Sequence, residues 1–137
     1  MTRARAERIA ADPDAAGRLV EQARRHLASA AAPQVDAESA YGLTYQAALK
    51  AMIATLLADG CRVAAGAGSH IVTLHEVRRR LDAEAEVLDR IDLVRRTRHA
   101  VFYEADEVSS EELRTATGDA THLVEAAARF VAGAKRQ

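Results

Sequence analysis

Arg98 is the residue of this sequence whose position most suggests a chemical role. Advancing 100° per residue along the helix expected at residues 87–103 gathers its apolar residues into one arc, and Arg98 falls near the middle of that arc. A guanidinium stays protonated, so burying it without a partner is costly. Arg98 therefore needs a carboxylate, a cluster of carbonyl groups, a water-filled cleft or an anionic ligand. The apolar members of the arc are Val87, Ile91, Val94, Val101, Phe102 and Ala105.

Three polar residues stand close to Arg98 on the same expected helix. Arg95 lies at the edge of the apolar arc, and His99 and Tyr103, one turn apart, lie just beyond it. Two guanidiniums, an imidazole and a phenol in one groove can neutralise a phosphodiester, deprotonate a ribose 2′-hydroxyl and protonate a leaving oxygen. The structural alternative is that Arg98 reaches the rim of the core or pairs with an acidic residue of a neighbouring helix.

The composition predicts that helices position these residues. The chain has 137 residues, close to the size of one domain, and is 49% hydrophobic with only 4% aromatic residues. Its two prolines, Pro13 and Pro33, both lie early, so the rest of the chain is free of this helix breaker. We predict an all-α fold, an antiparallel bundle of four to five helices. We expect residues 1–12 to be a flexible N-terminal arm and residues 13–137 to be a single helical-bundle domain.

Capping signals divide the chain into these helices. Asp12 or Asp14 is expected to cap the first helix, and Asp36 the second, which ends at residues 59–60 (Asp-Gly). Ser69 is expected to cap a third helix.

The second half of the chain continues the pattern. A bend is expected near residues 82–86, followed by a helix that reaches Tyr103. Ser109 and Glu112 form the capping-box pattern that should start the last helix.

Charge and cysteine content narrow the function classes. With 19 basic and 20 acidic residues the net charge is −1, which does not indicate a strongly basic nucleic-acid binder. The single Cys61 cannot form an internal disulfide, and no signal peptide or membrane-spanning run is visible, so we expect a cytoplasmic protein with no membrane association. The five histidines show no metal-ligand spacing, so we expect no metal and no cofactor.

Two segments resemble the HEPN (higher eukaryotes and prokaryotes nucleotide-binding) superfamily. SAYGLTYQAALKA, residues 39–51, is similar to the tyrosine- and alanine-rich second helix of many members, and RRTRHAVFY, residues 95–103, is similar to their fourth helix. The resemblance implies a bundle of four or five helices that is usually dimeric. Many members are metal-independent endoribonucleases, often toxins of toxin–antitoxin systems or of phage defence. Arg98 matches the arginine of their motif and His99 the polar residue after it, while Tyr103 occupies the position of the family's catalytic histidine.

The resemblance therefore implies a homodimer with a polar cleft at its interface that binds RNA or a nucleotide. Arg98, His99 and Tyr103 are the candidate catalytic residues of a metal-independent endoribonuclease of the toxin or defence type, and Arg95 is the candidate substrate-binding residue. An antitoxin or another protein is a further expected partner. A second interpretation stays open, in which the chain is a catalytically inactive helical dimer that acts as a protein-interaction module.

Overall fold

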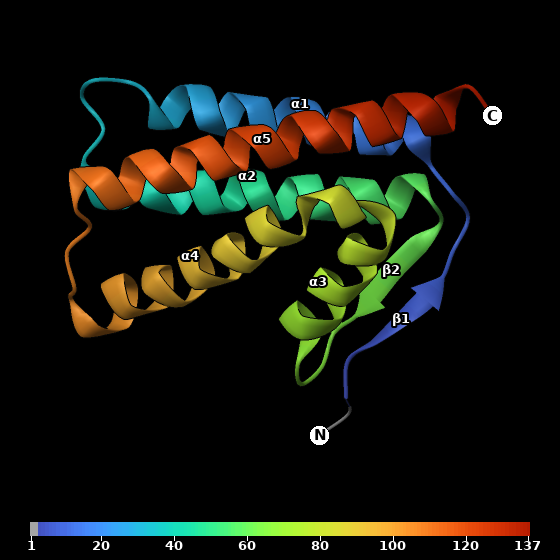
Figure 1. Ribbon diagram of the computed structural model, residues 1–137, viewed down its shortest axis with the longest axis horizontal. Helices are drawn as coiled ribbons and strands as arrows, with labels where there is room; N and C mark the ends of the chain where they lie inside the picture. Colours follow the sequence, from blue (N-terminus) through green and yellow to red (C-terminus); the bar gives the residue numbers. More distant parts are fainter. Residues whose placement is uncertain (1–2) are drawn as a thin grey trace.

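The structure is a computed structural model and describes residues 3–137 as five α-helices packed together, with a two-stranded sheet at one side (Figure 1). The all-α bundle predicted from the sequence is confirmed, and the small sheet is added to it. Successive long helices run in opposite directions, and α1, α2 and α5 lie side by side along the long axis of the molecule (Figure 1). In chain order the elements are β1 Arg5–Arg8, α1 Pro13–Ala30, α2 Ala37–Ala58, β2 Cys61–Ala64, α3 Ser69–Arg80, the 3₁₀ helix η1 Asp82–Glu84, α4 Ala85–Glu104 and α5 Ser110–Lys135.

Local capping interactions set most of the helix starts. The side chain of Asp12 accepts a hydrogen bond from the Ala15 amide at 3.0 Å, and Asp36 caps α2 in the same way. Ser109 and Glu112 form the expected reciprocal capping box, with both hydrogen bonds at 3.0 Å. Each cap satisfies amide groups that the first turn of a helix leaves without partners.

The expectation that Ser69 caps α3 is wrong. The capping position is Gly68, whose φ is +78°, and no side chain caps this helix. Ser69 is instead the first helical residue. The glycine adopts a left-handed conformation that other residues rarely adopt, and this shifts the start of the helix by one residue.

Small side chains form the centre of the bundle. Many alanines of α1, α2 and α5 are completely buried, so these helices pack closely. Larger residues from α3, α4 and α5 fill the space beside them, and the largest fully buried aliphatic side chains are Leu88, Ile91, Leu123, Val77 and Val124. The alanine-rich second helix is therefore the centre of the core. Among residues 3–137 no helix is both long and apolar enough to cross a bilayer.

The N-terminal segment contains a strand, which corrects the expectation of a flexible arm over residues 1–12. Strand β1 pairs antiparallel with β2, so that Arg5 lies opposite Ala64 and Arg8 opposite Cys61. The Ile9 amide continues this pairing by donating to the Gly60 carbonyl at 2.9 Å. These backbone hydrogen bonds fix the segment although its side chains are mostly exposed. Residues 1–2 of the predicted arm lie outside the described residues.

The helix α4 is buried along only part of its length. Leu88, Ile91 and Val94 are buried, whereas Phe102 is 72% exposed and Ala105 lies exposed just beyond the helix end. The burial predicted for Phe102 and Ala105 is therefore wrong. Towards its C-terminal end α4 diverges from α2 and α5 (Figure 1). The partly buried Val101 still packs there against the cluster of Tyr41, Val94, Val108 and Ala116.

Candidate functional site

Arg98 is half-buried and lies against α2. Its guanidinium carbon is 5.6 Å from the centroid of the Tyr45 ring, a cation–π geometry. Gly42 of α2 lies beside it: a Cβ atom at that position would be 3.8 Å from Arg98 Nε, an ordinary van der Waals contact. Within residues 3–137, no carboxylate oxygen lies within 4.0 Å of the Arg98 guanidinium. Among the described residues, Arg98 is therefore partnered by the aromatic face of Tyr45 and not by an anion.

Arg95 is held by a carboxylate one turn earlier on α4. Its Nε donates to Asp92 Oδ1 at 3.1 Å, and Arg96 Nε lies 3.6 Å from Asp92 Oδ2. One carboxylate therefore serves two guanidiniums, so the trio keeps a net positive charge. Arg95 is the half-buried member on the side of α3, and Arg96 is the exposed one.

His99 and Tyr103 are exposed and contact each other. Their ring centroids lie 4.5 Å apart at an interplanar angle of 40°, and the Phe102 ring meets Tyr103 edge-on at 4.8 Å. The four predicted residues therefore divide between different surroundings within one chain. Arg98 lies on Tyr45, Arg95 on Asp92, and the rings of His99 and Tyr103 contact each other at the exposed end of α4.

A pocket of about 210 Å³ lies beside Arg95, between α2, α3 and α4. Of the four predicted site residues, Arg95 is the one that lines it. Sequence reasoning missed His70, because only the packing of α3 against α4 brings it to this pocket. The lining residues are Tyr45, Leu49, Met52, Ser69, His70, Thr73, Leu74, Ile91, Asp92 and Arg95.

Tyr45 connects this pocket with Arg98. Burial raises the pKa of the Tyr45 phenol, while the positive charges of Arg95 and Arg98 act in the opposite direction. Because the net shift is upward, the phenol stays protonated at neutral pH and can donate a hydrogen bond. Tyr45 is thus an aromatic support for Arg98 and a polar group of the pocket wall.

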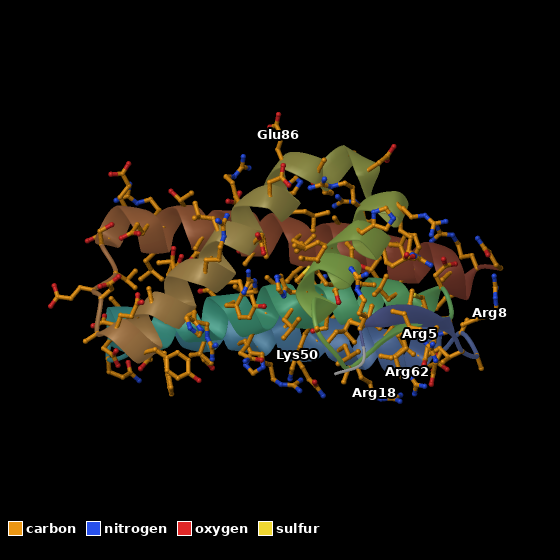
Figure 2. All side chains as sticks on the ribbon, turned by 90° about the horizontal axis from the view of Figure 1, so that it is seen from below. Arg5, Arg8, Arg18, Lys50, Arg62 and Glu86 are labelled. Atoms are coloured by element: carbon orange, nitrogen blue, oxygen red, sulfur yellow. The ribbon has the colours of Figure 1, made fainter. Side chains whose placement is uncertain are left out.

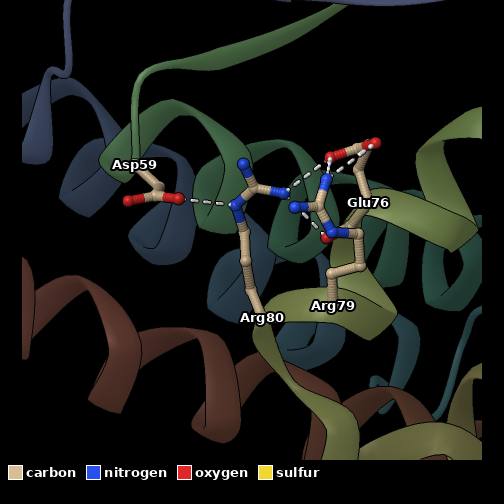
Figure 3. Close-up of polar contacts among 4 residues, drawn as sticks. All are labelled: Asp59, Glu76, Arg79 and Arg80. Atoms are coloured by element: carbon tan, nitrogen blue, oxygen red, sulfur yellow. Dashed lines mark hydrogen bonds and ion pairs between the residues drawn. The ribbon is translucent and has the colours of Figure 1, made fainter.

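A second polar cluster joins α3 to the end of α2 (Figure 3). The buried Glu76 accepts hydrogen bonds from Arg79 Nη1 at 3.1 Å and from Arg80 Nη1 at 3.0 Å. Arg80 Nε also donates to Asp59 Oδ2 at 2.8 Å. The hydrogen bond from Arg80 holds the pKa of Glu76 below its ordinary value. The charges of this cluster are paired with one another, and the contact between Arg80 and Asp59 connects α3 to the end of α2.

Several basic side chains lie at the edge of the molecule opposite Glu86, a residue in the first turn of α4 (Figure 2). Figure 2 shows Arg18, Lys50 and Arg62 along one edge of the molecule, with Glu86 at the opposite edge. Some of this charge is neutralised locally, since Arg62 Nη2 lies 2.9 Å from Glu7 Oε2. Over the described part of the chain, no three His, Cys, Asp or Glu residues are grouped closely enough to hold a metal ion.

Comparisons with known proteins do not identify a family. No family model, curated protein or solved structure matches this chain. The comparisons therefore add no support to the resemblance to the HEPN superfamily, and any functional proposal depends on the chain's own residues.

Proposed function

We propose that this protein is a homodimer that binds RNA or a nucleotide on the C-terminal half of α4. The proposal rests on two features that occur together there. Arg98 is half-buried and has no carboxylate oxygen within 4.0 Å among residues 3–137. A cluster of exposed rings lies just beyond it on the same helix. A phosphate supplies the anion that Arg98 lacks, and bases stack on aromatic side chains whatever their sequence. The rings are those of His99, Phe102 and Tyr103.

The dimer is proposed from the exposed apolar surface of the same helix. Phe102 is 72% and Tyr103 is 69% exposed, and their rings contact each other. Large apolar side chains that are grouped on a surface are typical of interaction sites. A second copy packed against this end of α4 would cover the rings and place two Arg98 residues beside one cleft, as the resemblance to HEPN domains implies.

The catalytic form of the proposal assigns each residue a step in metal-independent RNA cleavage. Arg98 stabilises the charge that develops on the phosphorane, and His99 carries the proton, since an imidazole exchanges protons near neutral pH more readily than a phenol. Tyr103, in ring contact with His99, positions that imidazole or donates to the substrate. Within one chain the Arg98 guanidinium faces Tyr45 and not His99 or Tyr103. Arg98 of one copy is therefore proposed to act together with His99 and Tyr103 of the other copy.

Binding of a fluorescein-labelled single-stranded RNA, measured by anisotropy in EDTA, tests the proposal. Arg98→Ala should weaken binding at least tenfold, because a charge-assisted hydrogen bond contributes about 1.5–3 kcal/mol. Arg129→Ala is the matched control: it removes the same charge from an exposed position in the C-terminal half of α5. Equal affinities of the two variants would contradict the proposed site, and RNA integrity on a gel reports cleavage separately.

The exposed rings also favour a second candidate function, a catalytically inactive dimer that binds a protein partner such as an antitoxin. In that case the wild-type protein shows no RNA affinity at all. Light scattering coupled to size exclusion should nevertheless give the mass of a dimer. A monomer at all concentrations, together with RNA binding, would exclude this candidate and the shared cleft alike.

A further inference from the structure

The pocket between α2, α3 and α4 has a cationic end. Arg95 uses its Nε for Asp92, so its terminal nitrogens remain for another acceptor. Asp92 is shared with Arg96, which leaves the trio with net positive charge. His70 also lines the pocket. This end is therefore chemically suited to one carboxylate or phosphate group.

The start of α3 reinforces this polarity. Ser69 and His70, its first two residues, line the pocket, and no side chain caps the helix. Uncapped amide groups and the helix dipole both favour a negative group at this position. The Tyr45 phenol and the Thr73 side chain also line the pocket wall.

The rest of the pocket is apolar. Leu49 and Met52 from α2, Leu74 from α3 and Ile91 from α4 line it. The side chains of Leu49, Ser69 and Thr73 also line a neighbouring hollow of about 390 Å³. Its further lining is mostly apolar and consists of Ile9, Ile53, Leu56, Leu57, Cys61, Arg62, Val63 and Ala65. The apolar surface therefore extends beyond the pocket itself.

We propose that this pocket binds a small amphiphilic anion, a carboxylate on a short unbranched hydrocarbon chain. The carboxylate lies between Arg95 and the start of α3, and the chain lies on Leu49 and Met52 and extends toward the neighbouring hollow. At about 210 Å³ the pocket is smaller than the roughly 300–1,000 Å³ of sites for drug-sized ligands. A short chain therefore fits it better than a nucleotide does, and this site is distinct from the proposed RNA surface around Arg98.

Calorimetric titration of the full chain with sodium octanoate, butyrate and inorganic phosphate tests the proposal. Affinity should rise about fourfold for each added methylene that the pocket covers, so octanoate should bind well over tenfold more tightly than butyrate. Inorganic phosphate should bind more weakly than octanoate because it lacks the chain. Octyltrimethylammonium, with a chain of similar length and the opposite charge, should not bind.

Two variants test the role of Arg95. Arg95→Gln should weaken octanoate binding ten- to hundredfold. Arg96→Gln is the matched control, since Arg96 shares Asp92 but does not line the pocket. Circular dichroism melts establish that both variants fold.

Three results would overturn the proposal, and the first does not depend on any variant. These are equal affinities for butyrate and octanoate in the wild-type protein, binding of octyltrimethylammonium, or equal octanoate affinity in Arg95→Gln and Arg96→Gln.

Discussion

Replacing Glu76 by glutamine should destabilise the protein at neutral pH, because it removes the charge that pairs with Arg80, the α3 side chain that reaches Asp59 at the end of α2. The Glu76 side chain is 11% exposed and accepts from Arg80, whose side chain is 16% exposed. Arg80 also reaches Asp59 at 2.8 Å, so the three side chains form one continuous ionic network (Figure 3). Glutamine keeps the shape of Glu76 and one acceptor oxygen but loses the charge.

The expected magnitude follows from the burial of each partner. Arg79 also contacts Glu76, but its side chain is 64% exposed, so that pair contributes little. The bond from Arg80 is nearly buried, and charged hydrogen bonds of this kind contribute about 1.5–3 kcal/mol. Arg80 retains Asp59 and the Glu76 carbonyl as acceptors, which favours a loss of about 2 kcal/mol. For a domain of this size that corresponds to a fall in Tm of roughly 6–8 °C.

The stability that Glu76 contributes depends on pH. Because Arg80 lowers the pKa of Glu76 in the folded state, the unfolded chain takes up the proton first as the pH falls. The stability from Glu76 is thus fully present above its ordinary pKa of 4.5 and is lost as the pH falls through the lower pKa of the folded state. Glutamine does not titrate. The Tm difference between wild type and variant should therefore be largest near neutral pH and shrink below about pH 4.

Calorimetric melts from about pH 7 down to about pH 3 measure this difference. Glu86→Gln is the matched control, because it makes the same change at an exposed position in the first turn of α4, and it should alter Tm little. A Tm difference for Glu76→Gln that stays constant across the pH range would refute the ionic explanation. An equally large effect of Glu86→Gln would refute it as well.

Three further substitutions should change the free energy of unfolding, which urea denaturation measures; two should lower it and one should raise it. Gly60→Ala should lower it by about 2 kcal/mol or more, because φ is +74° there and a Cβ atom would lie 2.7 Å from the Ile9 carbonyl oxygen. Gly118→Ala should raise it by about 0.5–1 kcal/mol, because this α5 glycine has nothing within 4 Å of a new Cβ; a decrease would contradict that reasoning. Ser109→Ala should lower it by about 1 kcal/mol by removing the capping box, and an unchanged value would show that the cap is redundant.

The helix starts could be predicted because they depend on neighbours in the sequence. Asp12, Asp36 and Ser109 each accept from an amide three residues ahead, so the pattern and the contact coincide. At Gly68 the same logic failed, because a glycine in a left-handed conformation started the helix without a side-chain cap. Capping patterns therefore locate a helix start to within a residue and do not identify every cap.

The strand pair could not be predicted, because its information is not local. Residues 5–8 have three charged side chains of four and no apolar alternation, the usual signal of a strand. The segment is ordered by backbone hydrogen bonds to residues 61–64, which lie more than fifty positions away in the sequence. The amides of Ile9 and Asp12 also donate to the carbonyls of Gly60 and Leu57, so the segment after β1 is bonded to the end of α2.

The position of Arg98 could be predicted from the sequence, but its neighbours on other helices could not. A helical wheel correctly turned Arg98 toward the bundle, but it cannot say which helix lies opposite each residue. It therefore missed that Tyr45 meets Arg98 and that His70 shares a pocket with Arg95. Both contacts depend on how α2 and α3 pack against α4.

The disagreement between periodicity and burial in α4 favours the proposed dimer. Phe102 belongs to the same apolar arc as Ile91 and Val94, yet it is exposed where they are buried. A large ring that its own chain leaves exposed brings no hydrophobic stability to that chain. The apolar arc therefore extends beyond the part of α4 that its own chain covers. A second copy covering this end would bury the ring and would also enclose Arg98, so the same packing that completes the core would form the proposed cleft.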